Sequence, residues 1–215
     1  MIHIVDYGMC NVGSIRNMLK RVGVAAVVSP DAEDLRRAER IILPGVGSFD
    51  AGMENLEQRG FVEVLDERVR GAGVPVLGIC LGMQLLTRSS EEGRRAGLGW
   101  LAADTVRFDF SALDSRPRVP HMGWNTIDPR REHELFAGLE APPRFYFVHS
   151  YHVVCEDPTD VLATCRHGYE FTCVVGRSNV FGTQFHPEKS HRFGLRLLEN
   201  FSRVSVQASA HPEQA

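Results

Sequence analysis

The chain has 215 residues, a common length for one domain and enough to bury a hydrophobic core without disulfides or a metal. Hydrophobic residues make up 43% and charged residues 24%, so the chain is globular, and disorder, collagen and coiled coil are excluded. The formal net charge of −3 gives no electrostatic footprint for nucleic acid or for an anionic membrane.

The first half alternates apolar strands with amphipathic helices. Short β-rich runs predict strands over residues 2–5, 24–28, 41–43 and 74–79, with Pro44-Gly45 ending the third strand. Helical spacing predicts helices over residues 11–22, 31–38, 49–58, 61–71 and 82–88. This alternation predicts right-handed βαβ units, and therefore an α/β fold with a doubly wound, mostly parallel sheet and helices on both faces.

The second half contains mainly strands separated by turns. Strands are expected over residues 105–108, 145–149, 161–164, 171–175 and 180–185, and a closing helix over residues 193–201. These strands predict an antiparallel extension of the parallel sheet. With no internal repeat or linker, we expect one domain over residues 1–203 and a flexible C-terminal tail over residues 204–215.

The cysteines form no recognisable framework. The chain has five cysteines, which are Cys10, Cys80, Cys155, Cys165 and Cys173. They are widely spaced and include no C-x-x-C pair. Neither a disulfide framework nor a zinc site is expected, and plain packing is expected of the last three. No signal peptide precedes the first strand, and no apolar run approaches the ~20 residues that span a bilayer. We therefore expect a cytoplasmic protein without a metal or cofactor.

One cysteine lies in a motif with chemical meaning. The segment G-I-C-L-G over residues 78–82 follows an apolar strand and precedes a helix, which is the arrangement of a nucleophile elbow. The two glycines leave room for a tight turn, and the start of the following helix favours a thiolate at Cys80. The backbone N–H of Leu81 would then face a developing oxyanion. The alternative is a buried Cys80 that only packs.

A base and its orienting acid follow a later strand. His186 and Glu188 are two residues apart, so in an extended segment their side chains point the same way. The carboxylate can then fix the imidazole tautomer, as in a nucleophile–His–acid triad. The alternative is a surface His beside a surface Glu, which becomes less favoured when the elbow cysteine is considered as well.

These two blocks resemble the class I (triad) glutamine amidotransferases. The matching segments are G-I-C-L-G-M-Q over residues 78–84 and Q-F-H-P-E over residues 184–188. Four further segments resemble the glutaminase subunit of imidazole glycerol phosphate synthase, of histidine biosynthesis. They are D-Y-G at 6–8 with Asn11, L-P-G-V-G-S-F at 43–49, P-H-M-G-W-N at 120–125 and Y-F-V-H-S-Y at 146–151. The resemblance runs from residue 1 to about residue 203.

The resemblance implies hydrolysis of glutamine to glutamate and ammonia by a triad of Cys80, His186 and Glu188. It also implies an oxyanion and substrate site built from Gly45, Val46, Gly47, Leu81, Gln84, His149, Ser150 and Tyr151. The glycines of the 44–47 segment would permit a peptide flip, although this segment could also be a plain turn. Gln84 could equally be a solvated helix residue.

The resemblance further implies a heterodimer with a (β/α)8-barrel cyclase. Through an ammonia channel, that partner would make imidazole glycerol phosphate and AICAR. No P-loop or G-x-G-x-x-G occurs in the chain, so the phosphorylated acceptor is expected to bind the partner. Expected interface residues are Tyr7, Asn11, Met122, Trp124 and Lys189, with core packing as the alternative for Trp124.

Other functions remain open from the residues alone. Segments 14–23, 97–108 and 186–193 resemble a paralogous branch linked to bacterial surface glycans, in which the ammonia serves amidino-sugar formation. Cys10 also stands where the family usually has glycine. More remote alternatives are a cysteine hydrolase of other amides or a non-catalytic scaffold subunit.

Overall fold

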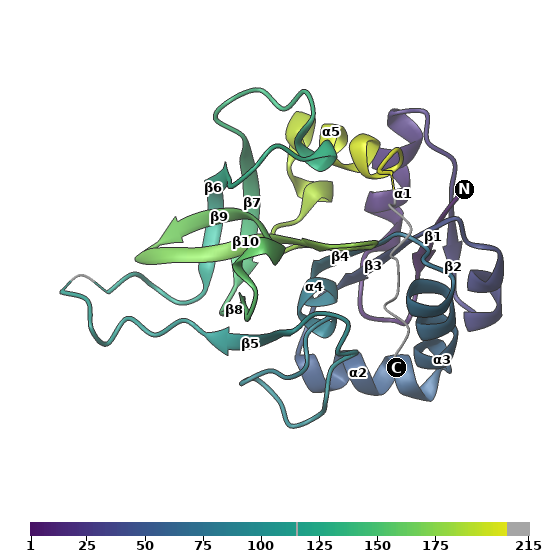
Figure 1. Ribbon diagram of the computed structural model, residues 1–215, viewed down its shortest axis with the longest axis horizontal. Helices are drawn as coiled ribbons and strands as arrows, with labels where there is room; N and C mark the ends of the chain where they lie inside the picture. Colours follow the sequence, from purple (N-terminus) through teal and green to yellow (C-terminus); the bar gives the residue numbers. More distant parts are fainter. Residues whose placement is uncertain (115, 206–215) are drawn as a thin grey trace, which may run out of the picture.

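The computed structural model describes residues 1–114 and 116–205 (Figure 1). The strands are β1 (Ile2–Val5), β2 (Ala26–Ser29), β3 (Arg40–Gly45), β4 (Val76–Cys80), β5 (Ala103–Arg107), β6 (His121–Pro129), β7 (Arg144–His149), β8 (Tyr151–Cys155), β9 (Val161–His167), β10 (Tyr169–Arg177) and β11 (Val180–Thr183). The α-helices are α1 (Val12–Arg21), α2 (Phe49–Gln58), α3 (Phe61–Asp66), α4 (Leu81–Leu85) and α5 (His191–Phe201).

The sheet has a parallel part and an antiparallel part. The parallel part runs in the order β2-β1-β3-β4-β11. The antiparallel part continues through β10, β9, β6 and β7, while β8 pairs with both β5 and β10. The predicted α/β fold, a parallel sheet with an antiparallel extension, is therefore confirmed, but the sheet is mixed rather than mostly parallel, because antiparallel pairings outnumber parallel ones among the described residues.

Helices cover both faces of the parallel strands (Figure 1). On one face, Ile15 of α1 and Leu197 of α5 belong to the same buried cluster as Ile4 of β1. On the other face, Phe49 of α2 packs in a second cluster with Val5 of β1. Neighbouring residues of one strand thus enter opposite cores, because side chains alternate across a strand. Both clusters include residues of β3, β4 and β11.

Several element boundaries differ from those expected. β3 does not stop before Pro44-Gly45: these two residues continue the ladder beside Ile79 and Cys80 of β4. The helix expected over residues 82–88 is shorter, since α4 ends at Leu85. Residues 31–38 form only a short 3₁₀ helix, η1 (Ala32–Arg37), and residues 67–71 a π-helical turn, η2 (Glu67–Gly71).

Two strands were missed from the sequence. β6 contains glycine, asparagine and aspartate, which are poor strand formers, and tertiary pairing with β7 and β9 overrides that local preference. β8 follows β7 after Ser150 alone, without a separating turn signal. β7 and β8 are nevertheless distinct, because they pair with different neighbours.

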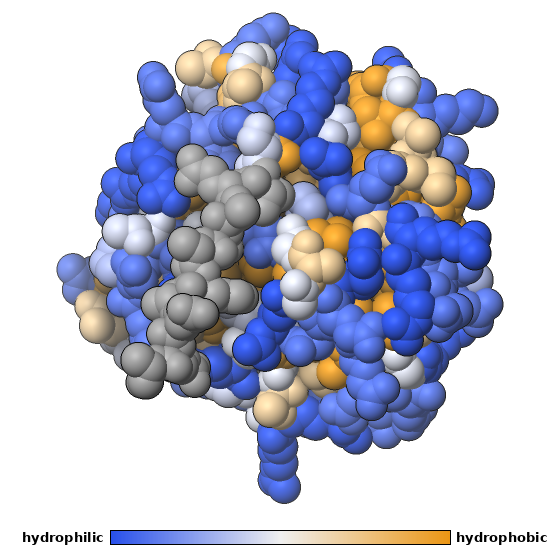
Figure 2. All heavy atoms as spheres, turned by 45° about the vertical axis from the view of Figure 1, so that its right-hand side comes forward, coloured by the Kyte–Doolittle hydropathy of each residue, from blue (hydrophilic) through white to orange (hydrophobic). Residues whose placement is uncertain are grey.

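The predicted tail over residues 204–215 falls largely outside the described residues, since residues 206–215 are not described. Val204 is buried, and the Ser205 N–H donates to Glu134 at 2.7 Å. The surface viewed in Figure 2 is mostly hydrophilic, with smaller apolar areas between charged side chains. Among the described residues, no helix is both long and apolar enough to cross a membrane.

Candidate active site

Cys80 lies at the junction of β4 and α4, on a backbone turn that few side chains tolerate. Its φ is +55° and its ψ is −109°, and the residue is only 7% exposed. A Cβ on Gly82 would lie 1.8 Å from the Leu43 carbonyl oxygen, and one on Gly78 would lie 2.6 Å from the Gly82 oxygen. The two glycines therefore allow the backbone to approach closely, which the elbow requires.

His186 and Glu188 lie just beyond the carboxyl end of β11. Because β11 runs parallel beside β4, with Thr183 opposite Ile79, the ends of both strands meet. The His186 Nδ1 lies 2.7 Å from the Glu188 Oε1 and donates to it; the His186 side chain is buried and that of Glu188 is 9% exposed. The His186 Nε2, on the other side of the ring, is buried without a hydrogen-bond partner among the described residues. One imidazole nitrogen is thus fixed by the carboxylate, and the other is free to transfer a proton.

The electrostatics of this group favour a charged imidazole. Burial lowers the pKa of His186, but the neighbouring Cys80 and Glu188 outweigh burial and raise the pKa to about 9. The Cys80 sulfur is thus near enough to affect the pKa of the ring, although the His186 Nε2 has no hydrogen-bond partner among the described residues. A raised pKa favours the protonated imidazole, which can act as a general acid.

A cavity of about 330 Å³ lies against these residues, within the usual size range of small-molecule pockets. It is lined by Val46, Gly47, Cys80, Leu81, Gln84, Glu92, Pro120, Val148, His149, Ser150, Tyr151 and His186. Of the site residues expected from the sequence, Gly45 and Glu188 do not line it. Gly45 is packed behind the wall, where an added Cβ would lie 2.4 Å from the Tyr7 hydroxyl.

One of the expected oxyanion donors, just after β3, is engaged elsewhere. The Val46 N–H donates to the Met9 carbonyl at 2.7 Å, so it does not point freely into the cavity. Gly47 follows with φ of +113°, a conformation that other residues rarely adopt. A peptide rotation would therefore be needed before Val46 could stabilise an oxyanion.

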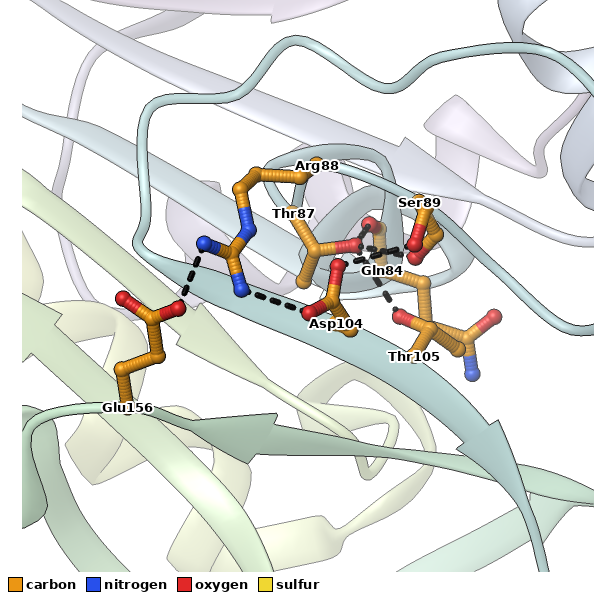
Figure 3. Close-up of polar contacts among 7 residues, drawn as sticks. All are labelled: Gln84, Thr87, Arg88, Ser89, Asp104, Thr105 and Glu156. Carbon is orange, nitrogen blue, oxygen red and sulfur yellow. Dashed lines mark hydrogen bonds and ion pairs between the residues drawn. The ribbon is translucent and has the colours of Figure 1, made fainter.

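Gln84 is buried, and its position is fixed from several sides. Its side-chain amide donates to the Tyr151 carbonyl at 3.3 Å. The Thr87 hydroxyl donates to the main-chain carbonyl of Gln84 at 2.7 Å and lies 3.2 Å from the Thr105 hydroxyl of β5 (Figure 3). The alternative of a solvated helix residue is therefore wrong, because Gln84 is only 5% exposed.

Arg88 ties the same segment to the antiparallel strands. Its guanidinium lies 2.6 Å from Asp104 of β5 and 2.6 Å from Glu156, just after β8 (Figure 3). The Ser89 hydroxyl also donates to Asp104, at 2.8 Å. These contacts hold the chain that leaves α4, and with it one wall of the cavity.

Sequence reasoning missed two groups at this site. Glu92 lines the cavity and is the one acidic residue in its wall, and its carboxylate also accepts from the Phe49 N–H at 2.8 Å. His121 of β6 lies behind the wall, with Nδ1 3.0 Å from the His149 Nε2. His121 lies in the P-H-M-G-W-N segment, which the sequence marks, whereas no local pattern marks Glu92.

The histidine pair is neutral and has defined tautomers. The Asn125 amide donates to the His121 Nε2 at 3.1 Å, which leaves the His121 Nδ1–H to donate to His149. The His149 Nδ1–H in turn donates to the Tyr151 carbonyl at 2.7 Å. Burial lowers the pKa of His121 to about 4, and burial lowers that of His149 strongly. The His149 ring thus stiffens the cavity wall and has no free nitrogen.

The residues expected at a partner interface lie in different environments. Asn11 and Lys189 are exposed, Met122 is 63% exposed and Trp124 is 40% exposed. The alternative of core packing is therefore wrong for Trp124. Tyr7 differs, because it is only 1% exposed and presents almost no surface in the isolated chain.

The indole of Trp124 stacks on the ring of His191, with centroids 5.2 Å apart. The Lys189 ammonium lies 5.6 Å from the centre of the Tyr146 ring on the neighbouring strand β7. We call this group of side chains the aromatic–basic patch. It consists of Met122, Trp124, Tyr146, Lys189 and His191.

The other cysteines have no evident chemistry. Burial raises the pKa of Cys10, Cys155 and Cys165 to about 12, and burial raises that of Cys173 strongly. All of them are free thiols. Within residues 1–114 and 116–205, no group of three His, Cys, Asp or Glu side chains is arranged to hold a metal ion.

Sequence comparison places the chain among known proteins. The profile described as "Glutamine amidotransferase class-I" matches residues 3–204. "Imidazole glycerol phosphate synthase subunit HisH 2" of Pseudomonas aeruginosa is 53% identical over 201 residues, which cover 94% of this chain and 98% of that protein. "Imidazole glycerol phosphate synthase subunit HisH" of Leptospira interrogans is 46% identical over 95% of this chain and all of that protein.

Structural comparison agrees on the fold. A crystal structure described as a glutamine amidotransferase superposes with a TM-score of 0.72 at 20% identity, covering 94% of this chain and 99% of that one. PurLQS from Thermotoga maritima gives a TM-score of 0.68 at 19% identity, covering 94% and 97%. With the profile match over nearly the whole chain, these findings show that the protein belongs to the class I glutamine amidotransferase family.

Proposed function

We propose that the chain is a glutaminase that hydrolyses glutamine to glutamate and ammonia through Cys80, His186 and Glu188. The observation that carries the proposal is the cavity of about 330 Å³ on which Cys80 and His186 meet, with Glu188 bonded to the far side of the imidazole. A nucleophile, a proton carrier and an orienting acid around one cavity are the parts that amide hydrolysis requires.

In the first half-reaction, the Cys80 thiolate attacks the carboxamide carbon of glutamine. The negative charge moves to the carboxamide oxygen, where the Leu81 N–H can stabilise it. As the C–N bond breaks, protonated His186 gives its proton to the departing nitrogen, which leaves as ammonia. The product is a glutamyl thioester on Cys80.

In the second half-reaction, His186 is neutral and acts as a base. It takes a proton from water, and the resulting hydroxide attacks the thioester carbon. The C–S bond breaks, glutamate leaves and the thiolate is restored beside the imidazolium. Glu188 keeps the ring in one orientation during both proton transfers.

The cavity wall also offers groups that match the rest of the substrate. The Glu92 carboxylate can pair with the α-ammonium group of glutamine. The Gln84 amide oxygen has no hydrogen-bond partner among the described residues and can accept a further hydrogen bond. We also assign substrate contacts to the backbone of His149, Ser150 and Tyr151, which line the cavity.

The free chain is expected to be slow. With the Val46 N–H bonded to Met9, one oxyanion donor is missing, and the loss of one such donor costs about 10²–10³ in kcat in a well-studied protease. A partner that rotates this peptide would switch the glutaminase on, coupling ammonia release to a loaded acceptor site.

The proposed partner is a (β/α)8-barrel cyclase that makes imidazole glycerol phosphate and AICAR for histidine biosynthesis. This proposal is supported by relatives at 46–53% identity that carry the name of an imidazole glycerol phosphate synthase subunit. The exposed aromatic–basic patch, together with Asn11, is the surface that we assign to this partner. A closed path between the subunits would keep ammonia neutral and out of water.

The deciding experiment compares two nitrogen sources in the complex with the cyclase. Cys80→Ala should abolish glutamine-dependent synthesis and retain synthesis from added ammonium salt. The proposal is falsified if glutamine use survives. An electrophilic glutamine analogue should also label Cys80, as found by peptide mass spectrometry. Equal labelling by a reagent without the glutamine moiety would instead indicate a hydrolase of other amides.

A further inference from the structure

Gln184 is a fully buried amide with no role in the mechanism above. It is 0% exposed and follows β11 directly, two residues before His186. Its main-chain N–H donates to the Cys173 carbonyl of β10 at 2.9 Å, which fixes the backbone. The backbone therefore needs no help from the side chain, whose carboxamide lies between α4 and Cys80.

The carboxamide of Gln184 links two residues of the active site. Its Nε2 lies 3.8 Å from the Cys80 sulfur and donates to it. Its Oε1 lies 3.2 Å from the Gln84 Nε2 and accepts from it. The nucleophile and a residue of the substrate wall thus share one buried amide.

The orientation of both amides follows from Tyr151. A carbonyl oxygen can only accept, so the atom of Gln84 that lies 3.3 Å from the Tyr151 carbonyl must be the nitrogen. The same nitrogen faces Gln184, so the oxygen of Gln184 must face Gln84. The remaining nitrogen of Gln184 then faces the sulfur, and no alternative placement satisfies all three contacts.

We propose that Gln184 is a positioning residue that holds the Cys80 sulfur for attack and aligns Gln84 in the substrate wall. An N–H donor is weakly attracted to a neutral thiol and more strongly to a thiolate, because the bond is then charge-assisted. The Gln184 amide therefore stabilises the reactive form of Cys80. The reaction it serves rests on the proposed glutaminase function, whereas the contact with sulfur does not.

Gln184→Met tests this role, since methionine has a similar length but neither the donor nor the acceptor of the amide. We expect alkylation of Cys80 by iodoacetamide, followed by mass spectrometry at pH 7.5, to slow by about tenfold. In the complex with the cyclase, kcat for glutamine should fall by a similar factor. The KM should rise by only about two- to fivefold, through the loosened Gln84.

Two control variants separate positioning from stability. Asn200→Leu removes another buried amide, whose nitrogen donates to the Leu135 and Ala137 carbonyls far from the cavity. This variant should lose stability without slowing the alkylation of Cys80. Gln84→Met removes the amide that anchors the Gln184 oxygen, so it should raise the KM and slow alkylation by less than Gln184→Met does. If Asn200→Leu slows alkylation as much as Gln184→Met, the role of Gln184 is merely structural.

A measurement on the unmutated Gln184 keeps the test valid if its variant does not fold. In chain labelled with ¹⁵N in glutamine side chains, Cys80→Ala should move the Gln184 amide signal. The exposed Gln58, which bonds to Glu54 at 3.1 Å, should not respond and serves as the reference. An unmoved Gln184 signal, or unchanged alkylation in Gln184→Met, would overturn the inference. Both readouts work even if wild-type protein does not hydrolyse glutamine, so the two proposals fail separately.

Discussion

Glu188→Gln removes the charge that holds His186 in place, and its effect on stability should depend on pH. In the folded chain the pKa of His186 is about 9, compared with 6.5 for an unperturbed histidine. Because the pKa is higher in the folded chain than in the unfolded chain, protonation of His186 stabilises the fold, and this contribution is fully present below pH 6.5. That contribution is lost as pH rises through 9, because the imidazole is then neutral in both states.

The structure sets the size of the effect. The gap between 6.5 and about 9 corresponds to roughly 3 kcal/mol in the free energy of unfolding, and solvent screening is small because His186 is only 1% exposed. Cys80 also contributes to the raised pKa, so Glu188→Gln removes only part of it. We expect the variant to lose about 1–2 kcal/mol at pH 6 and most of this difference to vanish by pH 10.

Urea unfolding of both proteins at pH 6 and pH 10 measures this difference, and an NMR titration of His186 measures the pKa directly. Glu33→Gln serves as the control, because Glu33 pairs with Arg36 at 2.8 Å in an exposed ion pair. It should cost at most about 1 kcal/mol at both pH values. A loss in Glu188→Gln that stays constant between pH 6 and pH 10, or grows, would refute the reasoning.

Two further predictions concern the elbow and the partner surface. Gly82→Ala places a methyl group 1.8 Å from the Leu43 carbonyl oxygen, so the free energy of unfolding, measured by thermal unfolding, should fall by at least about 1–3 kcal/mol. The control is Gly71→Ala, whose methyl group would meet no atom within 4 Å, and which should be neutral or stabilising. A stable Gly82→Ala would contradict the steric argument. Trp124→Ala should weaken binding of the cyclase by about 2 kcal/mol in calorimetry, and Val154→Ala, exposed on β8, should leave it unchanged. Equal affinities for both variants would place the interface elsewhere.

The local pattern of the sequence determined much of the scaffold. Apolar runs and helical spacing located β1, α1, α2 and α5 to within one or two residues. Their periodicity reports directly which side chains are buried. The elbow was also predictable, because the steric demand of its turn is written in neighbouring glycines around Cys80.

The arrangement around the nucleophile was decided by the tertiary structure. Cys80 and His186 are more than a hundred residues apart, and they meet because β11 inserts parallel beside β4. The contacts of Gln184 and Glu92 with this site depend on the same long-range placement. Gln184 stands in the Q-F-H-P-E segment, but that pattern does not show its contact with Cys80, and no local pattern marks Glu92. Tertiary packing likewise determines that Tyr7 is buried, that Trp124 is exposed and that the Val46 N–H donates to Met9. Sequence periodicity specifies which face of an element is buried, whereas the choice of neighbours depends on packing between distant segments.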